Sequence, residues 1–163
     1  LGHHRQCRVF LRRQIPQQGI RNFSRRHRGD KRRHGRIEST EAIGGGIAEY
    51  NTQQAGDDEG KNLCFVLRSP DQEIIGGVIG ATYWNWFYIN LMWIREDLRG
   101  QGHGHRLLAL AEEEARQRGA KYAHLDTFRY QEPGFYQQHG YQVFGELDDF
   151  PPGHQRYFLR KDL

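Results

Sequence analysis

The sequence is poor in cysteine and methionine, and it contains no long apolar run. Its 163 residues include two cysteines, Cys7 and Cys64, and a single methionine, Met92. Two cysteines do not make the disulfide framework of a small secreted protein, and Cys64, within an apolar segment, is interpreted as a small buried residue. No run of 18 apolar residues occurs, which argues against a membrane-spanning helix. We therefore expect a soluble cytoplasmic protein.

Several common ligand-binding motifs are also missing. No glycine-rich segment continues with Lys and then Ser or Thr, as a P-loop requires. The glycines at 100, 102 and 104 are spaced G-x-G-x-G, whereas dinucleotide-binding folds carry G-x-G-x-x-G. The ligand spacing of a zinc site is absent too, so we predict no metal. We also find no internal repeat.

Acidic residues are almost absent from the first 36 positions. This segment holds 12 of the 24 Lys and Arg residues but only Asp30 of the 20 acids, so its net charge is +11. The rest of the chain carries −7. A basic segment without apolar periodicity cannot bury enough surface to fold alone. We therefore expect a disordered arm over residues 1–35 and one folded domain over residues 36–163.

The arm admits three interpretations. It is upstream sequence translated in error, or it contacts nucleic acid or an anionic membrane through its charge, or it is a mitochondrial targeting segment. None of them defines the function of the folded domain.

What the sequence does contain is a concentrated anion-binding segment, LRGQGHGHRLL, at residues 98–108. Glycines allow a tight turn and close approach of a ligand to backbone N–H groups. The first N–H groups of the helix that follows have no partner within the helix and favour phosphate groups. The candidate ligand-binding residues of this cradle are consecutive: Arg99, Gly100, Gln101, Gly102, His103, Gly104, His105 and Arg106. The imidazoles of His103 and His105 are expected to lie in solvent.

This cradle and its flanks resemble those of the GCN5-related N-acetyltransferases (the GNAT superfamily). Residues 99–104, RGQGHG, resemble the [RQ]-x-x-G-x-[GA] loop of that family, and residues 91–98 resemble its lead-in, with Glu96 where proline is usual. Downstream, GFYQQHGYQV at residues 134–143 resembles the F-Y-x-x-x-G-[FY] segment. The resemblance covers residues 36–163. Within it, residues 125–161 resemble those of a subgroup of small bacterial members of the family.

Local patterns predict the elements of an α/β domain. The expected strands span residues 36–40, 62–68, 73–83, 86–94, 122–128, 141–147 and 156–160, and the expected helices span residues 41–54, 103–118 and 134–139. The strand over 86–94 is apolar on both faces, which predicts cover on both sides. The helix over 103–118 is expected to bury a stripe of Leu107, Leu108, Ala111 and Ala115 and to pair Glu112 with Arg116 at i, i+4 spacing. The resemblance implies a mixed, mostly antiparallel sheet that is splayed at the acetyl-CoA cleft and has helices on both faces.

The resemblance also implies the chemistry. Acetyl-CoA would be the co-substrate, bound by the cradle and by the backbone of Met92, Trp93 and Ile94, with direct transfer of the acetyl group to an amine. Tyr136 matches the tyrosine that protonates the leaving thiolate as general acid. The alternative for Tyr136 is simple packing against the sheet.

Two departures from the family leave parts of the site open. The middle of the central strand, where a carboxylate base would be natural, holds Asn90, which cannot act as a base. Arg129 stands where many relatives carry an asparagine that contacts pantetheine. The remaining candidates for the base are water, Asp126, Asp148, Asp149 and His154.

The acceptor is expected to be a small-molecule primary amine. Its pocket is expected to be built from the loop after Tyr50, the turn at residues 83–86 and the loop at residues 150–154. Aromatic rings there, with the acids at 57–59 and 148–149, would attract a cationic amine. Candidate contacts are Tyr83, Trp84, Asn90 and His154. Two alternatives stay open: a protein N-terminus or lysine as acceptor, and a cofactor-binding or nucleic-acid-associated module without turnover. A homodimer is plausible because the family often pairs.

Overall fold

The computed structural model describes residues 8–10 and 32–163, with side chains from residue 39 onward. The chain divides into two compact units. One contains the short strand β1 (Arg8–Phe10) and residues 60–163, and the other contains helix α1 (Arg32–Ala55). Most of the predicted arm, residues 1–7 and 11–31, lies outside the described residues, and so do its proposed contacts.

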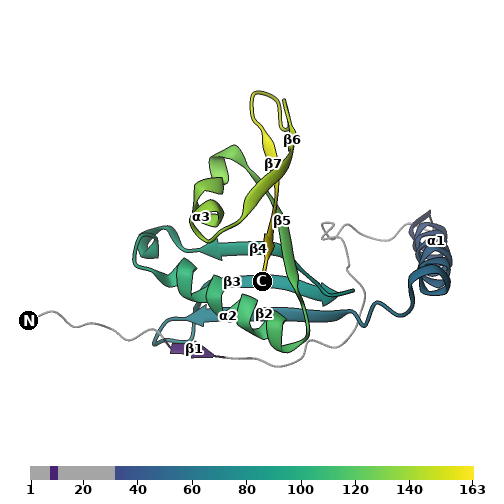
Figure 1. Cartoon of the computed structure of the whole chain (residues 1–163), viewed down its shortest axis with the longest axis horizontal. Coiled ribbons are helices and arrows are strands. Elements are labelled where there is room, and N and C mark those ends of the chain that lie inside the picture. Colours follow the sequence, from purple (N-terminus) through teal and green to yellow (C-terminus); the bar gives the residue numbers. More distant parts are fainter. Residues whose placement is uncertain (1–7, 11–31) are drawn as a thin grey trace, which may run out of the picture. The chain divides into compact units, whose positions relative to one another are not determined.

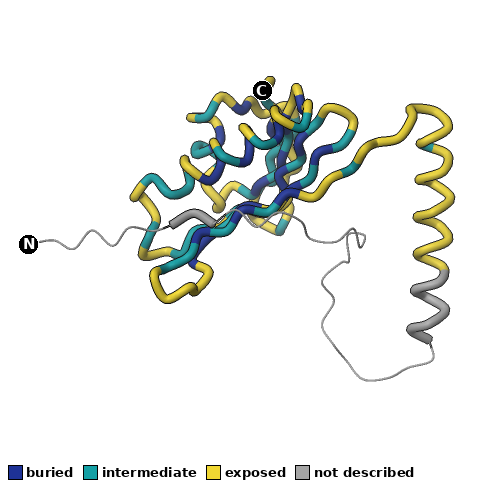
Figure 2. The backbone as a smooth tube through the Cα atoms, turned by 90° about the horizontal axis from the view of Figure 1, so that it is seen from below, coloured by how far each residue is buried: buried dark blue, intermediate teal, exposed yellow. Residues whose placement is uncertain are grey.

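Helix α1 corrects the first predicted strand. Residues 36–40, expected to be extended, lie inside this helix, which also includes the predicted helix over 41–54. The three glycines at 44–46 do not interrupt it, although glycine disfavours helix. Ile43, Ile47 and Tyr50 recur at helical spacing and are exposed, as are nearly all described side chains of α1 (Figure 2).

The larger unit is built on one mixed sheet (Figure 1). Its strands follow the order β1-β2-β3-β4-β5-β7-β6, and only β4 and β5 pair in parallel. After β1, the strands are β2 (Lys61–Arg68), β3 (Ile74–Tyr83), β4 (Trp86–Ile94), β5 (Tyr122–Phe128), β6 (Gln142–Leu147) and β7 (Arg156–Asp162). The predicted fold class, a mixed and mostly antiparallel α/β domain, is confirmed.

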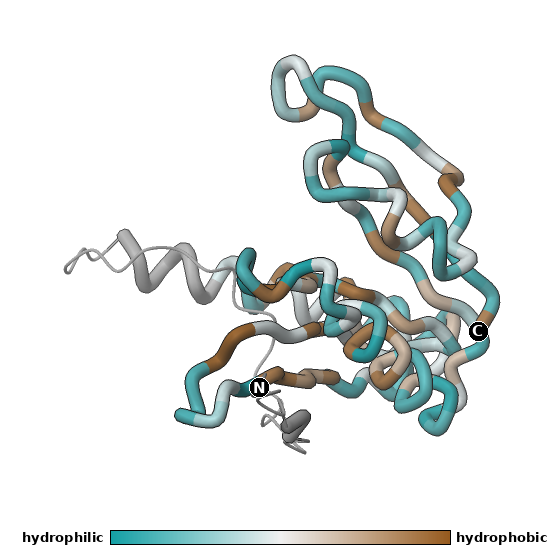
Figure 3. Tube along the Cα trace, turned by 90° about the vertical axis from the view of Figure 1, so that its left-hand side faces the viewer, coloured by the Kyte–Doolittle hydropathy of each residue, from teal (hydrophilic) through white to brown (hydrophobic). Residues whose placement is uncertain are grey.

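Helix α2 (His103–Gln117) connects β4 to β5 and packs on β2, β3 and β4. Its buried stripe of Leu107, Leu108, Ala111 and Ala115 matches the prediction. Gly119 ends the helix in a left-handed conformation. In Figure 3 hydrophobic and hydrophilic stretches alternate along the chain, and the outermost turns of the larger unit are mostly hydrophilic. We call the sheet side covered by α2 the α2 face, and the opposite side the open face.

Helix α3 (Pro133–Gln138) lies on the α2 face after the short 3-10 turn η2 (Arg129–Gln131). Pro133 occupies its first turn, where a missing N–H costs nothing. Phe135 approaches Gly104 at the start of α2, and Tyr136 joins the hydrophobic core. None of the described helices is long and apolar enough to cross a membrane.

Candidate active site

The central feature of the site is the divergence of β4 from β5. The two strands pair only from Trp86 with Tyr122 to Ile89 with Leu125. Beyond that point β4 stays paired with β3 and β5 stays paired with β7. We call the region between residues 90–94 of β4 and residues 126–128 of β5 the splay. One edge of β4 is therefore left without a neighbouring strand within the described part of the sheet.

A β-bulge at Asn90 marks the start of the splay. Ile89 pairs with Gly80 and Leu91 pairs with Ile79, so Asn90 is an extra residue on β4. Gly80 has to be glycine here, because a Cβ atom would clash with the carbonyl oxygen of Tyr88. A bulge reverses which side chains face which side of the sheet.

The reversal corrects the prediction that this strand is covered on both sides. Before the bulge, Phe87 and Ile89 are buried against α2; after it, Met92 and Ile94 pack toward the core. Leu91 and Trp93 point to the open face, where they are 61% and 50% exposed. Trp93, predicted to contact the cofactor, therefore has its side chain on the open face of β4.

The backbone of β4 presents hydrogen-bonding groups to the splay. The N–H of Arg95 donates to the carbonyl oxygen of Ile75 on β3, at 2.9 Å. Alternate N–H groups along a strand point to opposite edges, so the N–H groups of Met92 and Ile94 point toward the splay. The carbonyl oxygen of Ile94 accepts from Nε of Arg99 at 3.1 Å, which ties the cradle to the end of β4.

The glycine-rich cradle follows directly. The 3-10 turn η1 (Glu96–Leu98) leads into Gly100 and Gly102, which have φ angles of 71° and 82°. Gln101 donates from its side chain to the carbonyl oxygen of Asp97, at 3.0 Å, and this hydrogen bond holds the loop. These φ values favour glycine, as the sequence predicts.

The N-terminus of α2 can bind an anion. Gly102 is its N-cap, no side chain caps it, and the first intrahelical bond runs from the N–H of Arg106 to Gly102. The N–H groups of the first turn of α2, before Arg106, have no acceptor within the helix. The space around the Cα atoms of Gly100 and Gly102 is open, since a Cβ atom added to either would meet nothing within 4 Å beyond its chain neighbours. The cradle therefore fits the pyrophosphate of a coenzyme A derivative.

Two histidines lie beside the cradle. Nδ1 of His105 is 2.6 Å from Nε2 of His139, which follows α3, and both rings contact Phe135. Burial, with the charge of His105 adding to it, lowers the pKa of His139. His105 was expected in solvent, and its side chain is exposed but paired. Among the described residues no group of three metal-ligating side chains occurs.

Tyr136 lies next to the cradle. It is 9% exposed and contacts Tyr141 edge-on, with ring centroids 5.9 Å apart. Burial raises the pKa of its hydroxyl to about 12. That hydroxyl makes no hydrogen bond to the described part of the chain, where every fully buried polar side-chain atom has a partner. The hydroxyl oxygen is therefore not fully buried, and the group is protonated at neutral pH.

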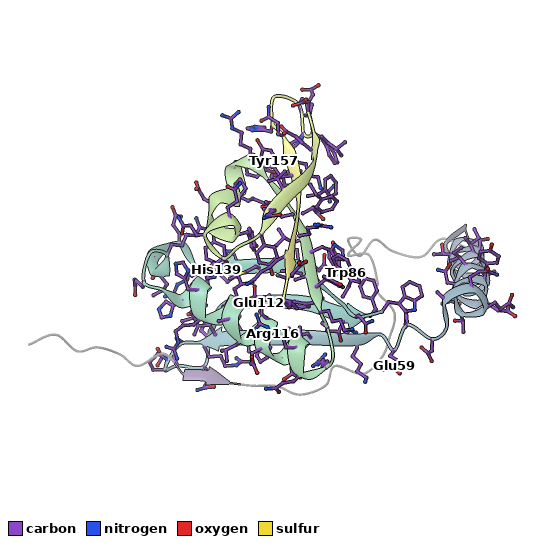
Figure 4. The ribbon with its side chains drawn as sticks, viewed as in Figure 1. Glu59, Trp86, Glu112, Arg116, His139 and Tyr157 are labelled. Carbon is purple, nitrogen blue, oxygen red and sulfur yellow. The ribbon has the colours of Figure 1, made fainter. Side chains whose placement is uncertain are left out.

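A buried charge network behind Tyr136 was not predicted from the sequence. The Glu112 carboxylate accepts from the Tyr141 hydroxyl at 3.0 Å and from Nζ of Lys161 at 2.7 Å, and it also pairs with Arg116. Figure 4 labels Glu112 and Arg116 on α2 and His139 after α3. The sequence showed only the i, i+4 pair with Arg116. The long-range partners of Glu112, Tyr141 and Lys161, could not be identified from the residues around Glu112 in the sequence.

On the open face, an aromatic cluster spans β3, β4 and β5. Tyr83, predicted to contact the acceptor, is hydrogen-bonded through its hydroxyl to Nε2 of His124, at 3.0 Å. His124 stacks on Tyr88 with ring centroids 4.8 Å apart. Burial lowers the pKa of His124, while the charge of Asp126 opposes that shift. Sequence reasoning missed His124 and Tyr88, although their alternation with buried residues along the strands indicated a shared face.

The other predicted acceptor contacts are only partly brought together. Trp84 lies at the tip of the β3–β4 hairpin with φ of 40° and contacts Tyr83 edge-on. Asn90 is at the bulge, and His154, in the β6–β7 loop, contacts Tyr130. Tyr83 and Trp84 are thus neighbours, whereas His154 belongs to a separate group of rings around Phe128.

Arg156 of β7 lies among the rings around Phe128. The Arg156 guanidinium lies 5.3–5.5 Å from the ring centroids of Phe128, Phe150 and Phe158, and its Nε donates to Oδ2 of Asp126 at 2.7 Å. A cationic acceptor was expected to contact the aromatic 150–154 loop by cation–π interaction. The protein's own cation takes that position at Phe150.

The structure also separates the candidate bases. Asp149 accepts the N–H of Gly153 at 2.7 Å and so shapes its own loop. Asp148 and His154 are exposed in the same loop. Asp126 is half-buried at the splay. Arg129 is hydrogen-bonded to Gln155, at 3.3 Å, which ties η2 to the start of β7.

Comparison with known proteins agrees with this geometry. Residues 30–141 match the model of the acetyltransferase (GNAT) family. An acetyltransferase of Agrobacterium fabrum is 34% identical over 124 residues, which cover 76% of this chain and 90% of the relative. Blasticidin-S acetyltransferase of Streptomyces morookaense is 39% identical over 92 residues, 56% of this chain and 68% of the relative. The crystal structure of an Agrobacterium tumefaciens protein described as an acetyltransferase matches with a TM-score of 0.73 and 31% identity, covering 88% of this chain and all of that one.

Proposed function

The chain belongs to the acetyltransferase (GNAT) family, and on this premise we propose that it transfers the acetyl group of acetyl-CoA to a primary amine of a small molecule. It is an acetyl-CoA-dependent acyltransferase by family. The nature of the acceptor is the part that we propose.

The observation that supports acetyl-CoA as the acetyl donor at this site is the free edge of β4. Its N–H groups at Met92 and Ile94 point into the splay, and the cradle lies at the end of the same strand. An extended, amide-containing chain can add to such an edge as a further strand, because the edge offers unpaired backbone groups. A pyrophosphate at the far end of that chain would then meet the N-terminus of α2. The combination suits pantetheine joined to a nucleotide.

The chain's residues then have separate tasks. Acetyl-CoA supplies an acetyl group activated as a thioester. Backbone N–H groups of Gly102, His103 and Gly104 bind its pyrophosphate, and the β4 edge orients the pantetheine arm. A backbone N–H at the splay stabilises the carbonyl oxygen as negative charge develops on it. Tyr136 donates its proton to the sulfur that leaves.

Two observations support a small-molecule acceptor. A relative that shares 39% identity over 92 residues is named for acetylating blasticidin S. The open face beside the splay carries the rings of Tyr83, Tyr88 and His124, which offer flat surfaces to a compact ligand. The alternatives are a protein N-terminus or lysine as acceptor, and a binding module that does not turn over.

The low cysteine content supports a cytoplasmic location.

The test is acetyl-CoA turnover by the full chain with a panel of amines, measured as released CoA thiol. The panel contains polyamines, amino sugars, amino-nucleosides and lysine-containing peptides. We expect release above background hydrolysis with one class of small amine. Release only with peptides would replace the small-molecule acceptor, and binding of acetyl-CoA without any release would favour a module without turnover.

A further inference from the structure

The open face at the splay holds one half-buried carboxylate, that of Asp126. The last paired residues of the two parallel strands are Ile89 and Leu125. The next position on each strand holds Asn90 and Asp126, so these two residues begin the splay on its two sides. The carboxylate that the middle of β4 lacks is therefore supplied by the adjacent position of β5.

The Asp126 carboxylate is held by Arg156 through its Oδ2 atom. Nε of Arg156 donates to Oδ2 of Asp126, and the closest approach of Nη2 of Arg156 is to the same oxygen. The side chain of Asp126 is 20% exposed. Arg156 is itself fixed among three phenylalanine rings. Asp126 is thus anchored at Oδ2 by a rigid cation, and the Tyr88 hydroxyl is its other polar neighbour. Because each carboxylate oxygen has two acceptor positions, Oδ1 can still accept from a further partner.

The groups that face Asp126 come from every neighbouring strand. Tyr88 of β4 has its pKa raised by burial, then by the Asp126 charge, and also by a side-chain hydrogen bond to Asp126, so its hydroxyl stays protonated beside the carboxylate. His124 of β5 shares the face and is hydrogen-bonded to Tyr83 of β3. Arg156 of β7 is the cation. Asp126 is the only carboxylate in this set of facing groups.

We propose, resting on the function proposed above, that Asp126 is the catalytic base: Oδ1 binds the ammonium group of the acceptor and takes one of its protons. The freed nitrogen forms the N–C bond as the C–S bond breaks, and the electron pair of that bond goes to sulfur. Tyr136 protonates the sulfur and regains a proton from water, and the second proton lost from nitrogen goes to water. Asp126 returns its proton to water.

The placement of acid and base supports this division of work. Tyr136 lies on the α2 face with Tyr141 and Glu112, whereas Asp126 lies on the open face with Tyr88 and Arg156. Acetyl-CoA in the splay is reached from both faces. The amine then enters from one side of the sheet while the proton for sulfur comes from the other.

The test compares Asp126→Asn with Asp162→Asn. Asp162 is an exposed carboxylate near the other end of β7 and loses the same charge. We measure kcat/KM for the acceptor between pH 6 and pH 9, and acetyl-CoA affinity by calorimetry. We expect Asp126→Asn to lower kcat/KM about 100-fold at pH 7 with unchanged acetyl-CoA affinity, as for loss of a general base.

The pH profile separates catalysis from structure. Without a base, Asp126→Asn can use only the neutral amine, so its kcat/KM should rise about tenfold per pH unit below the amine pKa and approach wild type. Equal activity of the two variants, or a deficit that is constant with pH, would overturn the proposal. Should Asp126→Asn not fold, Asp126→Glu keeps the charge but moves it, and wild-type kcat/KM in that variant would also overturn it.

Failure of the proposed function gives a different result. In that case wild type itself releases no CoA thiol with any amine, whatever residue occupies position 126. Binding of an amine to the CoA-loaded protein then decides whether Asp126 holds an ammonium group. We expect Asp126→Asn to weaken that binding at least tenfold, and equal binding by wild type and Asp126→Asn would reject the site.

Discussion

Nζ of Lys161 on β7 lies 2.7 Å from Oε2 of Glu112 on α2, and the two side chains are 18% and 6% exposed. This ion pair joins the helix that begins at the cradle to β7, the last strand of the chain. The Tyr141 hydroxyl donates to the other carboxylate oxygen of Glu112. The pair thereby fixes the segment that follows Tyr136.

Glu112→Gln should therefore destabilise the protein strongly. It leaves the ammonium of Lys161 poorly compensated in a largely buried place, which costs about 3 kcal/mol. The measurement is the free energy of unfolding in urea. Glu113→Gln is the matched control, since Glu113 is exposed and its pair with Arg116 spans 3.6 Å; a change within about 0.5 kcal/mol is expected there. Similar losses in both variants would contradict the role of burial.

Two of the three cradle glycines, Gly102 and Gly104, should respond differently to substitution by alanine. Gly102→Ala places a Cβ on a residue with φ of 82° and should cost about 1 kcal/mol of stability while weakening acetyl-CoA binding. Gly104→Ala carries no such φ, but its Cβ would lie 3.3 Å from the Phe135 ring, next to Tyr136. We expect it to lower kcat more than acetyl-CoA affinity. Calorimetry and turnover of the two variants separate these effects.

Tyr136→Phe should lower kcat by about 10²–10⁴-fold with little change in acetyl-CoA affinity, because it removes the proton donor and keeps the ring. Since the hydroxyl has a pKa of about 12, the wild-type rate should show no loss from this group up to pH 10. Tyr157→Phe, which alters a half-buried tyrosine of β7, serves as control. Equal kcat in both variants would assign Tyr136 to packing.

His124 should make folding stability sensitive to mild acid. Burial lowers its pKa below the unfolded value of 6.5, so below pH 6.5 the unfolded chain binds a proton that the folded chain does not. The free energy of unfolding should therefore fall as pH falls from 6.5 toward the folded pKa. Urea unfolding at pH 7.5 and pH 5.5 measures this fall, which should be smaller in His124→Gln. An equal fall in the variant would assign the effect elsewhere, for example to His139, whose pKa is also lowered.

Helices and strands whose sequences show a clear helical or alternating periodicity were predicted well. The strands over 86–94 and 122–128 match β4 and β5 in both bounds, and the stripe of α2 is buried as expected. Alternation and helical periodicity are properties of neighbouring residues, so they can be read directly. Residues 36–40 failed because five residues carry little periodicity, and the helix continues through them.

The site was predicted only where it is local. The cradle and its glycine conformations follow from one segment, and so does the short helix that carries Tyr136. The partners of Glu112 and the position of Asp126 beside Asn90 depend on strand order and register. Those are set by the whole sheet, which is why Asp126 could not be separated from the other candidate bases in advance.

The bulge at Asn90 is an extra residue that the sheet absorbs without changing the pairing on either side of it. Because Ile89 pairs with Gly80 and Leu91 pairs with Ile79, a chain without Asn90 would pair with β3 in unbroken register. Leu91 and Trp93 would stay on the open face, and Met92 and Ile94 would stay on the α2 face. Such a chain would lose only the local bend of β4 at the point where it leaves β5, so chain length at this position shapes the splay and not the core.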